Sequence, residues 1–364
     1  MKLALVQREG ADPAPLWLRV EVVKRALARG DEVLLLGSGF PPIAGARIET
    51  LQPFGMTASG RRKAFAKAAD ERAKLAACDL VLGFGDATVQ DVVRLDGGCR
   101  KTRVDFGAKA SDDDAVLEIE ARALSKGAFR VVIAPSSLVQ KDVLRRHGIA
   151  ADLVRVVSEG VDTARVHPGL RATVGAAARL QLKLSASDFV VLLAAAELDK
   201  MELDRMLRVL PEIARERPNV RIVVAGADAS FTKHKTDLGQ HVRFADGAGM
   251  PVDLIAASDL CLLYTRYSPF VSATLDALAC AVPVITTGWN GASDLVEQDR
   301  SGSVLEGFQD SQSLYRELSA WTKPERRAEG GAIARRAAEE HSIEREADRT
   351  LAVLDEVLTQ RRAR

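Results

Sequence analysis

Cysteine and histidine are the residue types in this chain that could build a metal site, so their spacing decides whether that chemistry is open. They are Cys78, Cys99, Cys261 and Cys280, and His147, His167, His234, His241 and His341. No two cysteines lie within four residues of each other, and no histidines have the HExxH or His-x3-His spacing. We therefore expect no metal ion, and we expect the cysteines to be small core residues in a reducing compartment.

A basic segment is the second feature that could do chemistry. Ser59–Lys74 reads SGRRKAFAKAADERAK, and Phe54 and Met56 stand just before it. We interpret this segment as a helix with two alternative roles. It can present an ordinary solvated face, or its basic and apolar side chains can bind an anionic membrane surface. The second role would make the protein peripheral on the inner face of the plasma membrane.

Length and composition limit the class of protein. At about 100–200 residues per domain, the 364 residues predict two domains. The hydrophobic fraction of 47% and charged fraction of 28% exclude a mainly disordered or fibrous chain. The net charge of +1 provides no overall basic excess for nucleic acid. The apolar run after Met1 is shorter than that of a signal peptide, and no window could span a bilayer, so we expect a cytoplasmic protein.

The first half of the chain alternates short apolar runs with helical patterns. The runs are Leu3–Val6, Glu32–Leu36, Leu80–Leu82 and Arg130–Ala134. Runs of this kind are typical of strands buried on both faces of a parallel sheet. Between the first two, Leu16–Ala28 has helical spacing and is followed by Arg29 and Gly30, a basic residue and a C-terminal cap. The start of the chain therefore predicts a right-handed βαβ unit.

The same pattern restarts in the second half. Its apolar runs are Phe189–Ala194, Arg221–Ala225, Leu260–Leu263 and Pro283–Thr286, and its expected helices are Leu203–Glu216, Pro251–Ala257 and Ala273–Cys280. We therefore expect an α/β protein with two doubly wound, Rossmann-like domains and a ligand in the crevice between them. The expected domains are residues 1–165 and 166–339, with a linker near 163–172. We expect the charged tail helix, 340–364, to pack back on the first domain.

A longer motif carries a resemblance to a known family. Ser258–Val284 and the residues just after it read SDLCLLYTRYSPFVSATLDALACAVPVITT. This resembles the nucleotide-sugar-binding segment of family 4 retaining glycosyltransferases, which have the GT-B fold and usually read ADLFVLPSxYEPFGxxxLEAxACGxPVxxT. In the first half, Asp79–Gly85, Asp91–Arg94 and the glycine pair Gly97-Gly98 resemble the lipopolysaccharide-core glucosyltransferase branch.

The resemblance implies a donor, an acceptor and a reaction. The expected donor is a nucleotide-diphosphate sugar, specifically a UDP-sugar, and the expected acceptor is a hydroxyl on a glycan or a lipid-linked glycan. The reaction would serve the synthesis of cell-surface polysaccharide or lipopolysaccharide. No metal is implied, because helix N-termini and protein cations can stabilise the leaving diphosphate.

The resemblance also implies site residues. Asp276 stands at the family's ribose-binding glutamate, and a carboxylate can accept hydrogen bonds from both ribose hydroxyls. Ser268, with seven residues between it and Asp276, stands at the family's other acidic residue, which contacts the donor sugar. Lys200 stands at the phosphate clamp, and Asp96 is the catalytic candidate on the acceptor side. The remaining donor-binding candidates are Arg205, Gly226, Phe270, Val271, Ser272 and Arg100.

Several positions depart from the family pattern and suggest a degenerate donor site. They are Pro13, Met201, Glu202, Ser268 and Val271. Proline has no N–H for a phosphate, Glu202 would repel a diphosphate, and serine binds a sugar hydroxyl more weakly than a carboxylate does. One alternative is therefore a non-catalytic GT-B protein that acts as a partner or scaffold for an active glycosyltransferase. Another is an enzyme whose donor carries less phosphate charge.

Overall fold

The chain forms two compact units. The computed structural model describes residues 1–8, 16–107, 113–194, 209, 212–213, 215–226, 241–245, 251–306 and 311–363. Unit 1 comprises Met1–Gly160 and Ile343–Arg364, and unit 2 comprises Val161–Ser342. Residues 161–165 and 340–342 thus belong to unit 2, whereas we expected them in the first domain. They pair with each other there, because the Val161 N–H donates to the His341 carbonyl over 3.0 Å.

Unit 1 is built on a seven-stranded sheet in the order β3-β2-β1-β4-β5-β6-β7. The strands are β1 (Lys2–Gln7), β2 (Glu32–Gly37), β3 (Arg47–Thr50), β4 (Leu80–Gly83), β5 (Val92–Arg94), β6 (Val131–Ala134) and β7 (Val154–Val156). Every neighbouring pair is parallel. The central strands are almost completely buried, as their continuous apolar runs require.

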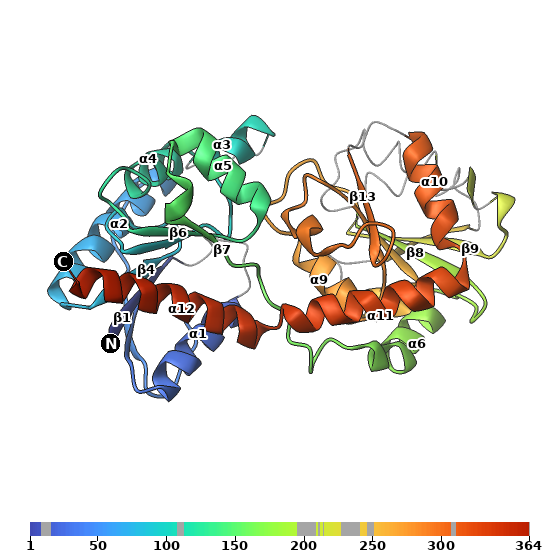
Figure 1. The fold of residues 1–364 in the computed structure, drawn as a ribbon, viewed down its shortest axis with the longest axis horizontal. Coiled ribbons are helices and arrows are strands. Elements are labelled where there is room, and N and C mark those ends of the chain that lie inside the picture. The colour runs from blue at the N-terminus through green and yellow to red at the C-terminus, as the bar shows by residue number, and fades with distance from the viewer. Residues whose placement is uncertain are drawn as a thin grey trace. The chain divides into compact units, whose positions relative to one another are not determined.

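Helices cover both faces of this sheet (Figure 1). They are α1 (Leu16–Ala28), α2 (Ala58–Leu75), α3 (Arg100–Asp105), α4 (Asp113–Ala123), α5 (Ser137–His147), the short η1 (Ala151–Leu153) and, from the end of the chain, α12 (Ile343–Arg362). On one face, Leu351 and Leu354 of α12 pack in the same cluster as Leu3 and Leu5 of β1. On the other face, Phe65 of α2 is buried. The last helix of the chain therefore completes the core of the first unit.

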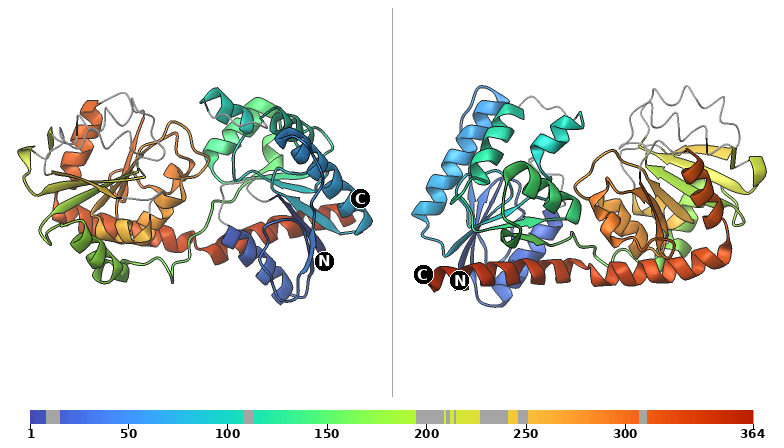
Figure 2. Two further views of the ribbon diagram at one scale, coloured as in Figure 1. Left: turned by 180° about the vertical axis from the view of Figure 1, so that it is seen from behind. Right: turned by 45° about the horizontal axis from the view of Figure 1, so that its top comes forward.

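Unit 2 contains a six-stranded sheet in the order β10-β9-β8-β11-β12-β13. Its strands are β8 (Phe189–Ala194), β9 (Val220–Ala225), β10 (Val242–Ala245), β11 (Leu260–Leu263), β12 (Val284–Thr287) and β13 (Gly302–Leu305). These strands are also parallel. Around them lie η2 (Pro168–Ala172), α6 (Val174–Gln181), α8 (Val252–Ala257), α9 (Ser272–Ala279), η5 (Gly291–Leu295), α10 (Ser311–Trp321) and α11 (Pro324–Glu340) (Figure 2).

The expected α/β architecture of two parallel, doubly wound sheets is confirmed. The expected helix at Leu203–Glu216 falls largely outside the described residues. The strands that we did not predict are β3, β5, β7, β10 and β13. Four of them are the edge strands of the two sheets. They are three or four residues long and partly exposed, so they lack the long apolar run that marks a buried strand.

Candidate functional site in unit 2

Gly226, Ser268 and the start of α9 lie at the carboxyl-terminal edge of the unit 2 sheet. In doubly wound sheets, ligands bind at this edge, where the strand order reverses. The reversal lies at β8, which has β9 on one side and β11 on the other. The structure describes the segments that follow β11 and β12, but not the one after β8. The candidates outside the described residues are Pro13, Lys200, Met201, Glu202 and Arg205.

Ser268 lies in the loop between β11 and α9 and is fixed through its backbone. Its N–H donates to the carbonyl of Trp289 over 2.9 Å, and its own carbonyl accepts from the Gly291 N–H over 2.9 Å. These two bonds make an isolated parallel bridge between Ser268 and Asn290. The loop after β11 is therefore hydrogen-bonded to the loop after β12, and these bonds fix the backbone position of Ser268.

Asn290 extends this connection with its side chain, which is fully buried. Its Oδ1 accepts from the Val271 N–H over 3.1 Å and from the Ala292 N–H over 2.9 Å. Its Nδ2 donates to the hydroxyls of Thr274 over 2.9 Å and Thr286 over 3.0 Å. One carboxamide thus joins the start of α9, the end of β12 and the start of η5.

The start of α9 contains Phe270, Val271 and Ser272. Phe270 is buried in the core of the unit. Val271 is the N-cap residue, and its apolar side chain makes no capping hydrogen bond. No acidic side chain lies in the first turn of the helix. The N-terminal end of α9 therefore carries its partial positive charge without a carboxylate or hydroxyl cap from Val271.

Asp276 lies in the middle of α9, eight residues after Ser268 in the chain. Burial raises the pKa of its carboxyl group to about 6, although the positive charge of Arg165 lowers it in part. In the described part of the chain, no hydrogen bond or ion pair to this carboxylate is found. A desolvated carboxylate of this kind is a common feature of binding and catalytic sites.

The other two donor-binding candidates that the structure describes lie in different units. Gly226 directly follows β9 in unit 2 and has a φ of 75°, a conformation that favours glycine. Arg100 is the first residue of α3 in unit 1. Its N–H donates to the carboxylate of Glu120 over 2.6 Å. A protein carboxylate therefore already occupies this helix start.

Asp96 is buried in unit 1 among charged groups of the protein itself. Arg94 donates to its carboxylate over 2.6 Å, and a guanidinium nitrogen of Arg19 lies 3.9 Å away. Arg94 also pairs with Glu346 of α12 over 2.5 Å and donates to Thr350 over 3.0 Å. Burial raises the pKa of Glu346 to about 7 despite this pairing. The geometry makes Asp96 part of a buried ionic cluster that attaches α12 to the sheet.

The structure thus brings Ser268, the start of α9 and Asp276 into one segment of unit 2, whereas Asp96 and Arg100 lie in unit 1. Sequence reasoning did not identify Asn290 as part of this segment. The sequence signal that could have identified it is the Asn290-Gly291 pair, which follows the end of the buried strand β12 at Thr287 by three residues. A polar residue placed directly after such a strand lies at the ligand-binding edge of the sheet.

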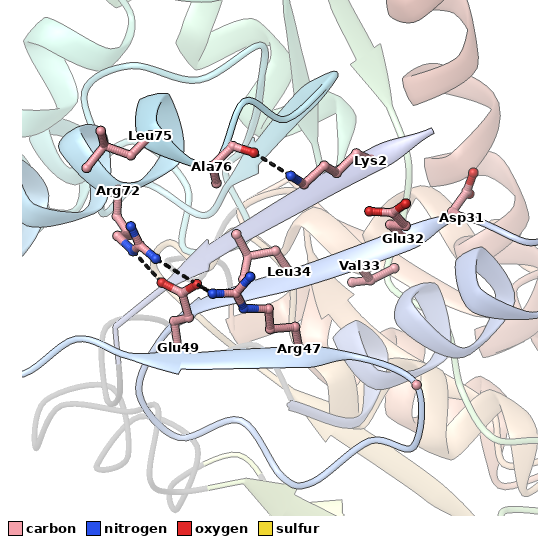
Figure 3. Close-up of a pocket in the computed structure, with 11 residues that line it drawn as sticks. Lys2, Asp31, Glu32, Val33, Leu34, Arg47, Glu49, Arg72, Leu75 and Ala76 are labelled. Carbon is pink, nitrogen blue, oxygen red and sulfur yellow. Dashed lines mark hydrogen bonds and ion pairs between the residues drawn. The ribbon is translucent and has the colours of Figure 1, made fainter.

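A cavity of about 420 Å³ lies in unit 1, at the amino-terminal edge of the seven-stranded sheet (Figure 3). It is lined by the starts of β1, β2 and β3 and the end of α2. The positively charged side chains that line the cavity bind other residues of its lining. Arg72 donates to Glu49 over 3.0 Å, Arg47 pairs with Glu49 over 2.7 Å, and Lys2 donates to the Ala76 carbonyl over 2.5 Å. These internal pairs leave little unbalanced charge to recognise a ligand.

The described residues contain neither a metal-binding cluster nor a membrane-spanning helix. Among these residues, no group of three or more His, Cys, Asp or Glu side chains is arranged to hold a metal ion. In the same part of the chain, no helix combines the length and apolar character that crossing a membrane requires.

Comparison with known proteins gives a family match in unit 2. Residues 189–322 match the family model described as Glycosyl transferases group 1. The spore coat protein SA of Bacillus subtilis is 23% identical over 57% of this chain and 60% of its own length. The D-inositol 3-phosphate glycosyltransferase of Saccharomonospora viridis is 30% identical over 45% of this chain and 41% of its own length. The chain thus spans about half the length of the curated relatives that it matches.

Solved structures match nearly the whole chain. WaaG, a glycosyltransferase involved in lipopolysaccharide biosynthesis, has a TM-score of 0.74 at 18% identity and covers 96% of this chain and 99% of its own. HepE of Anabaena in complex with UDP-glucose has a TM-score of 0.69 at 19% identity and covers 97% of this chain and 100% of its own. The chain therefore has the GT-B fold of these glycosyltransferases, and its residues 189–322 match the group 1 glycosyltransferase family.

Proposed function

We propose that the protein is a retaining glycosyltransferase. It would transfer a hexose from a UDP-sugar to a hydroxyl on a glycan or lipid-linked acceptor, in the synthesis of cell-surface polysaccharide or lipopolysaccharide. The observation that carries the proposal is the segment from Ser268 to Asp276, held over the carboxyl ends of β11 and β12 by bonds to residues 289–291. The family match over the same region and the UDP-glucose complex of HepE support the choice of donor.

Each part of this segment has a role in donor binding. Asp276, when ionised, accepts hydrogen bonds from the two ribose hydroxyls. The start of α9, around Phe270, Val271 and Ser272, directs its N–H groups and its dipole toward the diphosphate. The Ser268 hydroxyl binds a hydroxyl of the sugar. In the sequence, Lys200, Arg205 and the backbone at Gly226 complete the donor set, with Lys200 as the cation that stabilises the leaving phosphate.

The reaction follows from the placement of these charges. The bond between the sugar C1 and the β-phosphate oxygen breaks as the acceptor oxygen forms a bond to C1 from the same face. The leaving phosphate keeps the electron pair and accepts the proton of the acceptor hydroxyl. The start of α9 and the nearby cations stabilise the negative charge that grows on this phosphate. Residues of the protein supply all of these roles, so the proposal requires no metal.

In unit 1, we propose a structural role for Asp96 and a binding role for Arg100. The Asp96 carboxylate is engaged by Arg94, so its pairing favours stability over acid–base chemistry. The Arg100 side chain would bind an anionic group of the acceptor or the donor. Its partly exposed position at the start of α3 supports this, although its backbone N–H donates to Glu120.

Binding to an anionic membrane is proposed for the surface around α2. Phe54 and Met56, just before this helix, are each 88% exposed. The contribution of the helix cations is reduced by pairing, because Arg62 binds Asp86 over 3.2 Å in a buried position and Lys63 pairs with Glu118. The two apolar side chains therefore carry this proposal more than the net charge of 59–74 does.

The alternative remains a non-catalytic partner of an active glycosyltransferase. It is favoured by the residue types at Pro13, Met201, Glu202, Ser268 and Val271. An assay of sugar transfer distinguishes the two functions. The purified protein would be incubated with UDP-, GDP- and ADP-sugars and a mixture of lipid-linked and free glycan acceptors, and the products would be examined by NMR.

The proposal predicts transfer from one nucleotide sugar, with an anomeric proton signal that shows the same configuration as the donor. Transfer with inverted configuration would overturn the retaining mechanism. If the protein neither transfers a sugar from any donor nor hydrolyses any donor slowly, the result would favour the non-catalytic partner.

A further inference from the structure

We propose that Asn290 is a positioning residue for the donor site, which shapes the start of α9 without touching the donor. This inference rests on the proposed function and adds a residue to it. Asn290 lies outside α9 in the chain, between β12 and η5, but its side chain bonds directly to the start of that helix. Its side chain is 0% exposed, so it has no route to solvent or to a ligand.

The carboxamide of Asn290 uses its complete hydrogen-bonding capacity. Its oxygen accepts two bonds, from the Val271 and Ala292 N–H groups. Its nitrogen donates two bonds, to Thr274 and Thr286. A carboxamide has two donor hydrogens and two acceptor lone pairs. The orientation of the group is therefore fully determined by the surrounding atoms.

The two threonines fix the direction of these bonds. The Thr286 hydroxyl donates to the Leu263 carbonyl over 2.7 Å, so it must accept from Asn290. That bond also connects the network to the end of β11. Exchange of the carboxamide nitrogen and oxygen would place two acceptors against each other at Thr286 and two donors against each other at Val271. A buried network with such mismatches is strongly disfavoured.

The way in which Asn290 supports α9 matters for phosphate binding. An ordinary N-cap side chain accepts from the N–H of the second or third helical residue, and so occupies a donor that an anion could use. Asn290 instead accepts from the N–H of Val271, the cap residue itself. It therefore orients the first turn from outside while leaving that turn uncapped by the Val271 side chain.

The test compares two variants of the Asn290 network with one control variant outside it. Asn290→Ala removes all four carboxamide bonds, and Thr274→Val removes only the bond to the Thr274 hydroxyl and keeps the bond from the Val271 N–H. Thr287→Val is the matched control, since the Thr287 hydroxyl donates to the Thr265 carbonyl over 2.9 Å. This bond joins the same two loops but does not contact α9. UDP-glucose binding would be measured by calorimetry, the kinetic constants by transfer assay, and amide exchange by mass spectrometry.

We expect Asn290→Ala and Thr274→Val to weaken UDP-glucose binding about tenfold or more, since each leaves a buried polar group without its partner. The donor KM should rise, while the acceptor KM stays unchanged. Thr287→Val should change the dissociation constant for UDP-glucose less than about threefold, although its loss of stability should be similar to that of Thr274→Val. Amide exchange in residues 268–275 should be faster in Asn290→Ala and Thr274→Val than in the control.

Equal weakening of donor binding in all three variants would overturn the inference, because loop stability alone would then explain it. Unchanged binding in Thr274→Val would also overturn it, even if Asn290→Ala failed to fold. If the wild-type protein binds no nucleotide sugar, the proposed function fails, and amide exchange still tests whether Asn290 orders the start of α9. Equal exchange of residues 268–275 in Thr274→Val and wild type would then reject that role.

Discussion

At the scale of single residues, the carboxyl group of Asp276 is held where its charge is disfavoured. Burial raises its pKa to about 6, and the attraction to Arg165 offsets only part of this effect. The ordinary pKa of aspartate is about 3.9. An ionised carboxylate in this desolvated position lowers the stability of the folded protein. A bound ligand that donates two hydroxyl hydrogen bonds to it would compensate for this cost.

The raised pKa of Asp276 predicts a pH-dependent affinity for the donor. Only the ionised carboxylate can accept hydrogen bonds from both ribose hydroxyls, so UDP-glucose binding should weaken as the pH falls from 8 to 5, with a midpoint near pH 6. A nucleotide sugar is the suitable probe, because its diphosphate has no terminal phosphate that titrates in this range. Calorimetry of Asp276→Asn should show weak, pH-independent binding. An unchanged pH profile in this variant would contradict the role of Asp276.

The same shift makes a prediction for stability. The folded state holds the Asp276 proton more tightly than the unfolded state does, so this group's contribution to stability falls as the pH rises from about 4 to about 6. Asp276→Asn removes this partly buried charge and should raise the unfolding free energy at pH 8 by about 1–3 kcal/mol. The gain should disappear near pH 4, as measured by urea denaturation. A variant that is less stable at pH 8 would show that the carboxylate supports the fold.

At the scale of helices and strands, the sequence predicted the central elements well and the edges poorly. β8 and β11 begin and end at the residues expected from their apolar runs, and α1 has the predicted bounds. The edge strand β3 is largely exposed and has no such run. The Asn290 network could not be predicted, because its four partners come from three separate segments whose contact depends on the folded sheet.

The buried cluster around Arg94 predicts a large loss of stability when its cation is removed. Arg94→Leu would leave Glu346 buried without Arg94 and would leave Asp96 with the more distant Arg19, at 3.9 Å, which should lower the unfolding free energy by about 3–5 kcal/mol. Arg25→Leu is the control, because the Arg25–Asp348 pair also joins α12 to the unit but is largely exposed, and its loss should cost less than about 1 kcal/mol. Equal losses in urea denaturation would contradict the importance of the buried cluster.

At the scale of the whole molecule, the chain returns to its first unit after completing the second. Unit 1 includes Ile343–Arg364, and the apolar face of α12 lies in the core of that unit. The sequence predicted that the tail packs over other elements and forms no third domain, since its apolar residues become sparse along a charged helix. The sequence could not indicate at which residue the chain leaves unit 2, because the isolated bridge between Val161 and Ser342 produces no pattern in the sequence.

The proposed membrane surface predicts binding to anionic vesicles. Phe54→Ser combined with Met56→Ser should reduce binding to vesicles of phosphatidylglycerol and phosphatidylcholine by about tenfold or more, because two exposed apolar side chains would no longer enter the interface. Leu180→Ser, which changes an apolar side chain of unit 2 that is 80% exposed, should bind as the wild type does. Sedimentation would measure the bound fraction. Equal binding of all three proteins would reject this surface.

The measurement that tests the donor site most directly is calorimetric titration of the whole protein with UDP-glucose at pH 7.5. We predict a dissociation constant between about 1 μM and 1 mM, the usual range for enzyme substrates. Asp276→Ala should weaken it about tenfold or more, whereas Glu329→Ala, a change of an exposed carboxylate on α11, should leave it unchanged. Binding that Asp276→Ala does not weaken, or no binding of UDP-, GDP- or ADP-sugars at millimolar concentration, would contradict a functional donor site in unit 2.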